Sequence, residues 1–250
     1  MYILFDIGGS KMRVARTTVN GETFEGEQII DTPGTGEEII SRLKNVVAEP
    51  EAIAGGLTRK RVSVAEKIKS SFNCPVYLEN DTAIVGLGEA VSGAGRGSKI
   101  LAYITVSTGV GGVRIVNGVI DHSINGFEPG HQIIDFREPN KPFEDYISGT
   151  FVEKTTGKKP REITEMDFWS PLAKIMAVGL HNTIMHWSPD TVVLGGSMMK
   201  VPGIPIDEVR AELQKISHIF PTLPEVKLAA LGDIGGLHGA LALLRQKVSL

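Results

Sequence analysis

Short apolar runs alternate with glycine-rich polar turns along the chain. An apolar, β-prone run at residues 2–5 breaks at 6–11 (DIGGSK) and resumes at 12–15. This pattern predicts a β-hairpin whose turn is rich in glycine and polar groups. A second unit of the same kind occupies residues 100–116, with its turn at 107–112. The repetition predicts two related halves, and we call the two turns the first turn (6–11) and the second turn (107–112).

Apolar residues three and four positions apart predict helices between these strands. Thr35 and Glu38 have the spacing of a capping box, and apolar residues from Ile39 to Val47 line one face after them. Further helices are expected at 64–72, 83–90, 171–187 and 237–245. Strands that alternate with helices favour an α/β fold, with a domain boundary near residue 100.

The composition is that of a globular protein. The 250 residues are 42% hydrophobic and carry a net charge of −3, so the charge balance favours neither nucleic acid nor an anionic membrane as a partner. No signal peptide and no continuous apolar span are visible. The single cysteine, Cys74, excludes an intramolecular disulfide and a cysteine-cluster metal site. These features favour a cytoplasmic protein.

Glycine is frequent, with 29 residues, and three glycine-rich turns each follow a predicted strand. Backbone N–H groups in such turns can bind phosphate, and Ser10, Lys11 and Thr108 could add side-chain donors. The third turn, Gly195-Gly196-Ser197, follows an apolar strand. Any one of these turns alone is more typical of an ordinary hairpin. Asp6, beside the first turn, could hold a hydrated Mg²⁺.

A second candidate for chemistry is Glu79-Asn80-Asp81, at the end of the predicted strand 76–78. A carboxylate at this position could accept a proton from a substrate hydroxyl. On spacing alone, Asn80 and Asp81 are more typical of a helix N-cap.

A third candidate is the loop 126–131 (GFEPGH), followed along the chain by Glu144. Glu128 and His131 flank a turn in this loop, so both side chains could contact a polyol. Solvated surface residues are the ordinary alternative for a lone Glu and His in a loop.

Taken together, these segments resemble the ROK family of sugar kinases and repressors, within the actin-like/hexokinase fold group. The resemblance runs almost from end to end of the chain. The motifs that carry it are DIGGSK at 6–11, LEND at 78–81, TVSTGVGG at 105–112, NGFEPGH at 125–131, FEDYISG at 143–149 and VVLGGS at 192–197.

The resemblance implies a two-lobed, actin-like ATPase (ribonuclease H-like) α/β fold with duplicated mixed β-sheet domains and an interlobe cleft. Residues 1–99 with 237–250 would form the smaller N-terminal lobe, and residues 100–236 the larger C-terminal lobe. The resemblance also allows the protein to be a homodimer.

The resemblance further implies roles for single residues. Asp81 is implied to be the base that takes the proton of the sugar hydroxyl, and Asp6 to lie near Mg²⁺, held through water. The residues implied to bind the sugar are Asn80, Asp81, Glu128, His131 and Glu144. The residues implied to face the phosphates are Gly8, Gly9, Ser10, Lys11, Thr108, Gly109, Gly111 and Gly112, and Gly195 and Gly196 are implied to pack against the adenosine.

The sequence departs from the family pattern at two places. Many members carry a cysteine-rich zinc motif after the histidine of the sugar turn, whereas residues 132–143 contain no cysteine, so no structural zinc is expected. A longer insert usually precedes the END segment, whereas here only residues 57–62 and one helix separate Gly55-Gly56 from Glu79. The basic run Arg59-Lys60-Arg61 in this short segment is either a solvated loop or a contact for an anionic substrate.

The leading hypothesis is an ATP-dependent hexose kinase, most similar to glucokinases, that phosphorylates the 6-hydroxyl of the sugar. Fructose, mannose, allose and N-acetyl hexosamines are alternative acceptors, and polyphosphate is an alternative donor. A sugar-responsive repressor is disfavoured, because the first predicted strand begins at residue 2 and leaves no room for a helix-turn-helix module before it. A non-catalytic sugar-binding relative is the remaining alternative.

Overall fold

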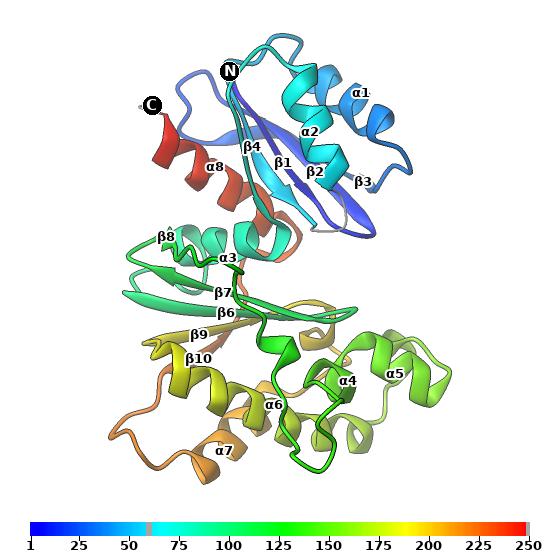
Figure 1. The fold of residues 1–250 in the computed structure, drawn as a ribbon, viewed down its shortest axis with the longest axis vertical. Helices are drawn as coiled ribbons and strands as arrows, with labels where there is room; N and C mark the ends of the chain where they lie inside the picture. The colour runs from blue at the N-terminus through cyan, green and yellow to red at the C-terminus, as the bar shows by residue number, and fades with distance from the viewer. Residues whose placement is uncertain (59–61, 249–250) are drawn as a thin grey trace. The chain divides into compact units, whose positions relative to one another are not determined.

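Two five-stranded sheets, one in each of two units, form the framework of the chain (Figure 1). The computed structural model describes residues 1–58 and 62–248. Unit 1 comprises Met1–Gly93 with Ala230–Leu250, and unit 2 comprises Ala94–Ala229. The basic run Arg59-Lys60-Arg61 lies outside the described residues.

The sheet of unit 1 has the strand order β3-β2-β1-β4-β5. Its first three strands form an antiparallel meander, whereas β1, β4 and β5 run parallel to one another. The strands are β1 (Ile3–Ile7), β2 (Lys11–Thr17), β3 (Phe24–Asp31), β4 (Ile53–Leu57) and β5 (Val76–Asn80).

The sheet of unit 2 repeats this arrangement. Its order is β10-β9-β6-β7-β8, in which β6, β7 and β8 form the meander and β6, β9 and β10 are parallel. The strands are β6 (Ile100–Val106), β7 (Val110–Val116), β8 (Val119–Ile120), β9 (Thr191–Gly195) and β10 (Glu225–Leu228). The two mixed sheets therefore share one strand order and one set of strand directions, which confirms the duplicated α/β fold.

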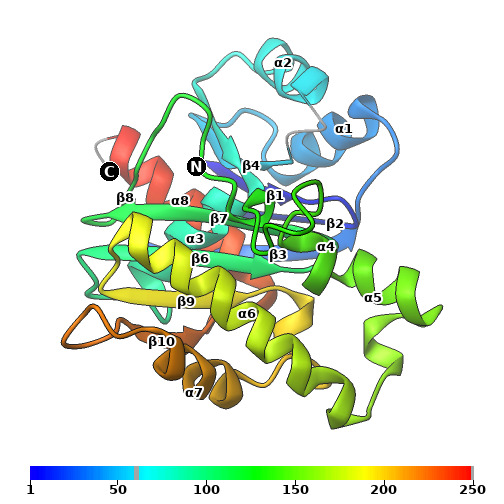
Figure 2. The same cartoon turned by 60° about the horizontal axis from the view of Figure 1, so that its bottom comes forward.

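Helices cover the sheets. In unit 1, α1 and α2 lie on one side of the sheet and α8 on the other (Figure 1). Figure 2 shows α6 alongside the sheet of unit 2, and α7 contacts both α6 and β10. The helices are α1 (Gly36–Val46), α2 (Val62–Ser71), α3 (Asp81–Ser92), α4 (Glu144–Ile147), α5 (Gly149–Thr156), α6 (Met166–Trp187), α7 (Ile206–Ile216) and α8 (Gly235–Lys247).

The local sequence signals explain most of the helix boundaries. The capping box at the start of α1 is formed, because Thr35 and Glu38 each accept the other's backbone N–H at 3.3 Å. The long helix α6 begins five residues earlier than expected and includes Pro171. Its first turns are held by Trp169, which is fully buried and donates its ring N–H to the carbonyl of Ile163 at 3.0 Å.

Each unit has a hydrophobic core of its own. The core of unit 1 packs β1, β2 and β4 against α1 and α2, and the core of unit 2 packs β6 and β9 against α6 and α7. Among the described residues, no helix is both long enough and apolar enough to cross a membrane.

Glycines allow α8 to approach α3 closely in unit 1. A Cβ atom on Gly88 of α3 would clash with the carbonyl oxygen of Gly235, and a Cβ on Gly239 of α8 would clash with the carbonyl oxygen of Ile84. Because both obstacles are backbone atoms, the helices could accept a side chain only by moving apart. This contact positions the N-terminus of α8 beside β1.

We expect Gly239→Ala to lower the free energy of unfolding by about 3 kcal/mol, because the added methyl group forces backbone apart in a packed helix pair. Urea denaturation followed by circular dichroism measures the loss. Gly34→Ala is the matched control, since its Cβ would meet no atom within 4 Å, and it should change stability by less than about 0.5 kcal/mol. Equal stability of the two variants would contradict the packing argument.

Candidate functional site

Two carboxylates lie at the carboxyl ends of parallel strands in unit 1. Asp6 is the next-to-last residue of β1, and Asp81 begins α3 directly after β5. Both strands pair with β4 in parallel, so their carboxyl ends lie at the same edge of the sheet. This edge is where open α/β sheets bind their ligands.

The N-cap interpretation of Asn80 is confirmed. Its side-chain oxygen accepts hydrogen bonds from the backbone N–H groups of Thr82 (3.0 Å) and Ala83 (3.4 Å). Asp81 Oδ1 also accepts from Thr82 N, at 2.9 Å. The cap fixes the backbone from which the Asp81 carboxylate projects, and the contact of both residues with a sugar stays a prediction.

Asp6 is a buried carboxyl group with a strongly shifted pKa. The residue is 4% exposed, and a Cβ on Gly236 of α8 would clash with its side chain. Burial raises the pKa of Asp6 from 3.8 to about 7. The guanidinium of Arg13, 3.4 Å away, opposes this rise, and the negative charge of Asp81 adds to it. Asp6 and Asp81 therefore interact electrostatically.

Arg13 is a site residue that the motifs did not indicate. It contacts Asp6 through Nη1 and lies 3.8 Å from Asp233 through Nη2. Its Nε is buried, with no hydrogen-bond partner among the described residues. The signal was present in the predicted hairpin, because the register of β1 and β2 pairs position 6 with position 13.

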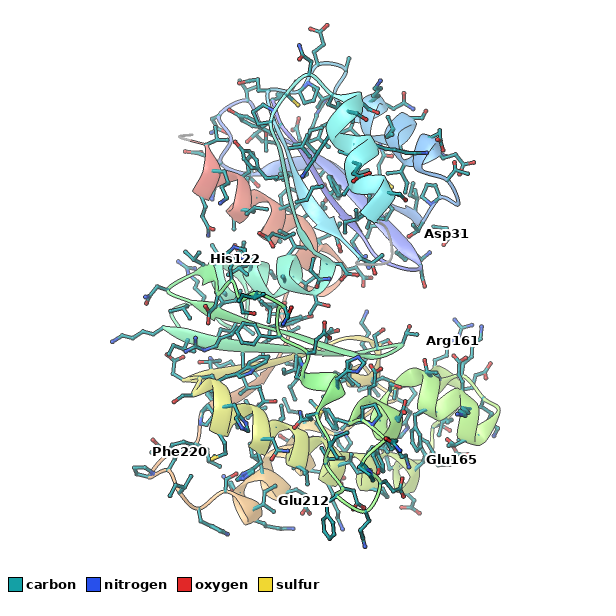
Figure 3. The ribbon with its side chains drawn as sticks, in the orientation of Figure 1. Asp31, His122, Arg161, Glu165, Glu212 and Phe220 are labelled. Atoms are coloured by element: carbon teal, nitrogen blue, oxygen red, sulfur yellow. The ribbon has the colours of Figure 1, made fainter. Side chains whose placement is uncertain are left out.

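The first turn is held mainly by its own hairpin. Gly8 N donates to Lys11 O at 3.0 Å, and the Lys11 ammonium pairs at 2.7 Å with Asp31 of β3, which is labelled in Figure 3. Gly9 and Ser10 are exposed between them. The expectation that all four residues from Gly8 to Lys11 face phosphate stays a prediction, and the N–H of Gly8 already has an acceptor within the turn.

The second turn is shorter than expected. Strand β7 begins at Val110, which pairs with Val106, so Gly111 and Gly112 lie in the strand. A Cβ on Gly112 would lie 2.6 Å from the ring of Pro129. Gly112 thus makes room for the loop 126–131, and this packing, rather than a turn conformation, requires a glycine at that position.

Glu144 joins two of the candidate segments in unit 2. Its Oε2 accepts the backbone N–H of Val110 at 3.0 Å, and its Oε1 lies 3.8 Å from His131 Nε2. A Cβ on Gly109 would lie 2.7 Å from Oε2. Glu128, three residues before His131, is exposed on the same loop and accepts the N–H of His131 through its backbone carbonyl.

The third turn lies next to the second. Ser197 Oγ is 3.2 Å from Ser107 Oγ, and Gly196 has a φ of +93°, which favours glycine. A Cβ on Gly195 would clash with the hydroxyl of Tyr103. A pocket of about 530 Å³ opens beside both turns, and its lining residues are Ser107, Thr108, Gly149, Thr150, Glu153, Lys154, Pro160 and Ser197. The sequence motifs did not indicate the lining residues after Gly149.

Comparison with known proteins identifies the family. A family model described as the ROK family matches residues 56–247. The chain belongs to the ROK family. It is 30% identical to a fructokinase from Zymomonas mobilis over 200 residues, which span 72% of this chain and 65% of that protein. It is also 25% identical to a xylose repressor from Bacillus subtilis over 175 residues, 61% of this chain and 45% of that protein.

Solved ROK structures share the fold. A ROK glucokinase from Streptomyces griseus, in complex with glucose and AMPPNP, superposes with a TM-score of 0.74 at 22% identity, covering 98% of this chain and 99% of that one. This likeness confirms the actin-like α/β fold. The roles of single residues in this ROK chain stay predictions.

The loop 132–143, where the family pattern often has cysteines, is held together by hydrogen bonds and a cation–π contact. Phe143 N donates to Gln132 O at 2.8 Å, which joins the two ends of the loop. The Lys141 ammonium lies 3.8 Å from the centre of the Tyr146 ring, and the hydroxyl of Tyr146 donates to Glu138 at 3.1 Å. Within the described ranges, no group of three or more His, Cys, Asp or Glu residues could hold a metal ion.

We therefore predict that the purified protein contains no stoichiometric zinc and that its melting temperature is unchanged by a chelator. Plasma mass spectrometry of the purified chain, together with thermal unfolding with and without EDTA, measures both properties. One zinc ion per chain would contradict this prediction.

Burial of Asp6 predicts a pH-dependent stability with a definite sign. A carboxyl group whose pKa is raised in the folded state binds its proton more tightly there, so its contribution to stability is lost as the pH rises from 3.8 through about 7. The free energy of unfolding of the wild type, minus that of Asp6→Asn, should fall across this range by an amount on the order of 4 kcal/mol.

Urea titrations at pH 4.5, 6 and 8, without divalent cation or nucleotide, measure this difference. Asp167→Asn, which removes an exposed carboxylate from the first turn of α6, is the matched control and should leave the pH dependence in place. A pH-independent difference between the wild type and Asp6→Asn would show that burial does not control this group.

Proposed function

We propose that this chain is an ATP-dependent hexose kinase that transfers the γ-phosphoryl group to the 6-hydroxyl of glucose. The observation that carries the proposal is the electrostatically coupled pair of Asp6 and Asp81 at the carboxyl ends of β1 and β5. Two carboxylates at a ligand-binding sheet edge match the requirements of phosphoryl transfer, which needs a proton acceptor and a group near the metal. Membership in the ROK family and the resemblance to a fructokinase support the same reaction class.

In the proposed reaction, Asp81 accepts the proton of the sugar 6-hydroxyl as its oxygen bonds to the γ-phosphorus. The bond from that phosphorus to the oxygen that bridges to the β-phosphate breaks, and ADP leaves. Proton transfer to a positioned carboxylate contributes about 10² to 10⁴ in rate. The cap formed by Asn80 and the hydrogen bond to Thr82 N reduce the motion of Asp81, which favours a reactive orientation.

The remaining sugar hydroxyls require hydrogen-bond acceptors and donors at short range. We assign this role to Asn80 in unit 1 and to Glu128, His131 and Glu144 in unit 2. Charged groups make the stronger hydrogen bonds to hydroxyls, and His131 and Glu144 are already neighbours. This assignment follows the ROK motifs and the proximity of the two side chains.

The pocket beside the second and third turns is our candidate for the donor. Hydroxyl groups of Ser107, Thr108 and Ser197 line it, and Lys154 adds a positive charge. The mostly exposed segment from Lys154 to Arg161 carries four basic residues and no acidic residue, so it favours a polyanionic donor. The bound AMPPNP in the Streptomyces griseus relative supports ATP as that donor.

Asp6 would hold Mg²⁺ through water. Mg²⁺ commonly takes one or two protein carboxylates and completes its coordination with water and phosphate oxygens, and the buried Asp6 carboxylate fits this pattern because a cation would offset its desolvation. When bound, the ion neutralises charge on the donor phosphates. Arg13 helps to keep Asp6 ionised at neutral pH.

The deciding experiment is a coupled ADP-release assay with a panel of acceptors: glucose, mannose, fructose, allose, N-acetylglucosamine and N-acetylmannosamine, each with ATP or with inorganic polyphosphate. We expect the highest kcat/KM for glucose with ATP. Highest activity on fructose would correct the substrate and keep the reaction. Calorimetric binding of a sugar with no turnover on any pair would instead favour a non-catalytic relative.

Asp81→Asn tests the proposed base. We expect kcat to fall by about 10² to 10⁴, with the melting temperature and the sugar dissociation constant close to wild type, because the amide keeps the size of the side chain but cannot accept the proton. Asp145→Asn, an exposed carboxylate of α4, is the matched control and should retain wild-type kcat. A largely active Asp81→Asn enzyme would eliminate Asp81 as the base.

A further inference from the structure

The second turn is bound to the segment 144–150 at several backbone positions. Gly149 N donates to Ser107 O at 2.7 Å, and the hydroxyl of Thr150 donates to Thr108 O at 2.6 Å. Glu144 Oε2 accepts the N–H of Val110 at the other end of the turn, at 3.0 Å. A displacement of segment 144–150 must therefore move the turn with it.

The base of this segment is firmly packed. Phe143, directly before Glu144, is 1% exposed, and its ring fills the space that a side chain at Gly179 of α6 would need. Ile147 is fully buried in the same core. The backbone around Glu144 is thus anchored to α6, and the adjustable part is the Glu144 side chain itself, which is partly exposed.

The two oxygens of this one carboxylate face different groups. Oε2 accepts a hydrogen bond from Val110 N. It lies close to Gly109, where an added Cβ would be only 2.7 Å from this oxygen. Oε1 lies 3.8 Å from His131 Nε2, which is beyond hydrogen-bond distance. A sugar hydroxyl that donates to Oε1 and accepts from His131 would close this gap and fix the orientation of the carboxylate.

We propose that Glu144 is a positioning residue that couples sugar binding to the geometry of the second turn, through one carboxylate shared between His131 and the Val110 N–H. This inference rests on the proposed function, because it takes the sugar to lie at His131 and the donor phosphates at the turn. It adds a role in donor binding to a residue otherwise assigned to the sugar alone.

The coupling is measured as the factor by which saturating sugar strengthens nucleotide binding. We would titrate AMPPNP and Mg²⁺ into the full chain by calorimetry, with and without glucose, and repeat the titrations with fructose. Because such a coupling factor is reciprocal and is taken at saturation, it does not depend on how tightly the sugar itself binds. In the wild type we expect at least a roughly fivefold enhancement.

Two variants separate the coupling from simple loss of sugar affinity. In Glu144→Gln, the single acceptor oxygen can take the place of Oε2, facing Val110 N–H, or of Oε1, facing the sugar hydroxyl, and the other place is taken by an NH₂ group that only donates. We expect less than half of the wild-type enhancement, taken relative to the variant's own AMPPNP affinity without sugar. His131→Ala should weaken sugar binding yet leave the link to Val110 intact, so it should retain more of the enhancement than Glu144→Gln.

The matched control is Asp145→Ala, which removes the neighbouring exposed carboxylate of α4 and should keep the full enhancement. A wild-type enhancement in Glu144→Gln would overturn the inference, as would a wild-type chain that phosphorylates sugar without any enhancement. A wild-type chain that neither turns over nor binds sugar and nucleotide would instead overturn the proposed function, so the two failures are distinguishable.

Discussion

The close approach of α8 to β1 and α3 is the constraint on which unit 1 depends. It requires glycine at Gly88, Gly236 and Gly239, where any side chain would meet backbone or the Asp6 carboxyl group. The same contact removes water from Asp6 and raises its pKa to about 7. A carboxyl group in such surroundings destabilises the folded state at neutral pH. Open α/β sheets commonly bind their ligands at the edge where Asp6 lies, so the proposed function gives a reason to keep the group there.

Unit 2 has the same sheet topology as unit 1 but different side chains at its strand ends. Its parallel strands and its hairpin end in turns rich in hydroxyl groups and glycine, which surround a pocket, whereas the corresponding edge of unit 1 carries acidic groups. One carboxylate, Glu144, lies on the neighbouring segment and contacts both the second turn and the loop of His131. The repeated framework thus carries different side chains at its strand ends in the two units, and the proposed function rests on these side chains rather than on the fold.

The sequence predicted the elements whose signals are local. The hairpins, the capping box of α1 and the N-cap at Asn80 depend on neighbouring residues, and the structure contains each of them. Whether a glycine is required depends on contacts with residues far away in the sequence. The composition therefore could not distinguish Gly239, which packs against Ile84, from Gly9, which is exposed. The predicted hairpin pairs position 13 with position 6, so the contact of Arg13 with Asp6 could have been predicted from the sequence. The pocket residues from Thr150 to Pro160 could not, because their place beside the second turn depends on how α5 packs against that turn.

The proposed reaction moves a phosphoryl group from a nucleotide to a sugar. Phosphorus-31 NMR of the wild-type protein with ATP, Mg²⁺ and glucose tests it most directly, because the spectrum identifies the product and its amount together. We expect a sugar phosphate monoester signal that grows in step with that of ADP, and a spectrum without this signal over the same time in reactions that contain Asp81→Asn. Formation of ADP and inorganic phosphate alone, or no reaction with any hexose of the panel, would contradict it.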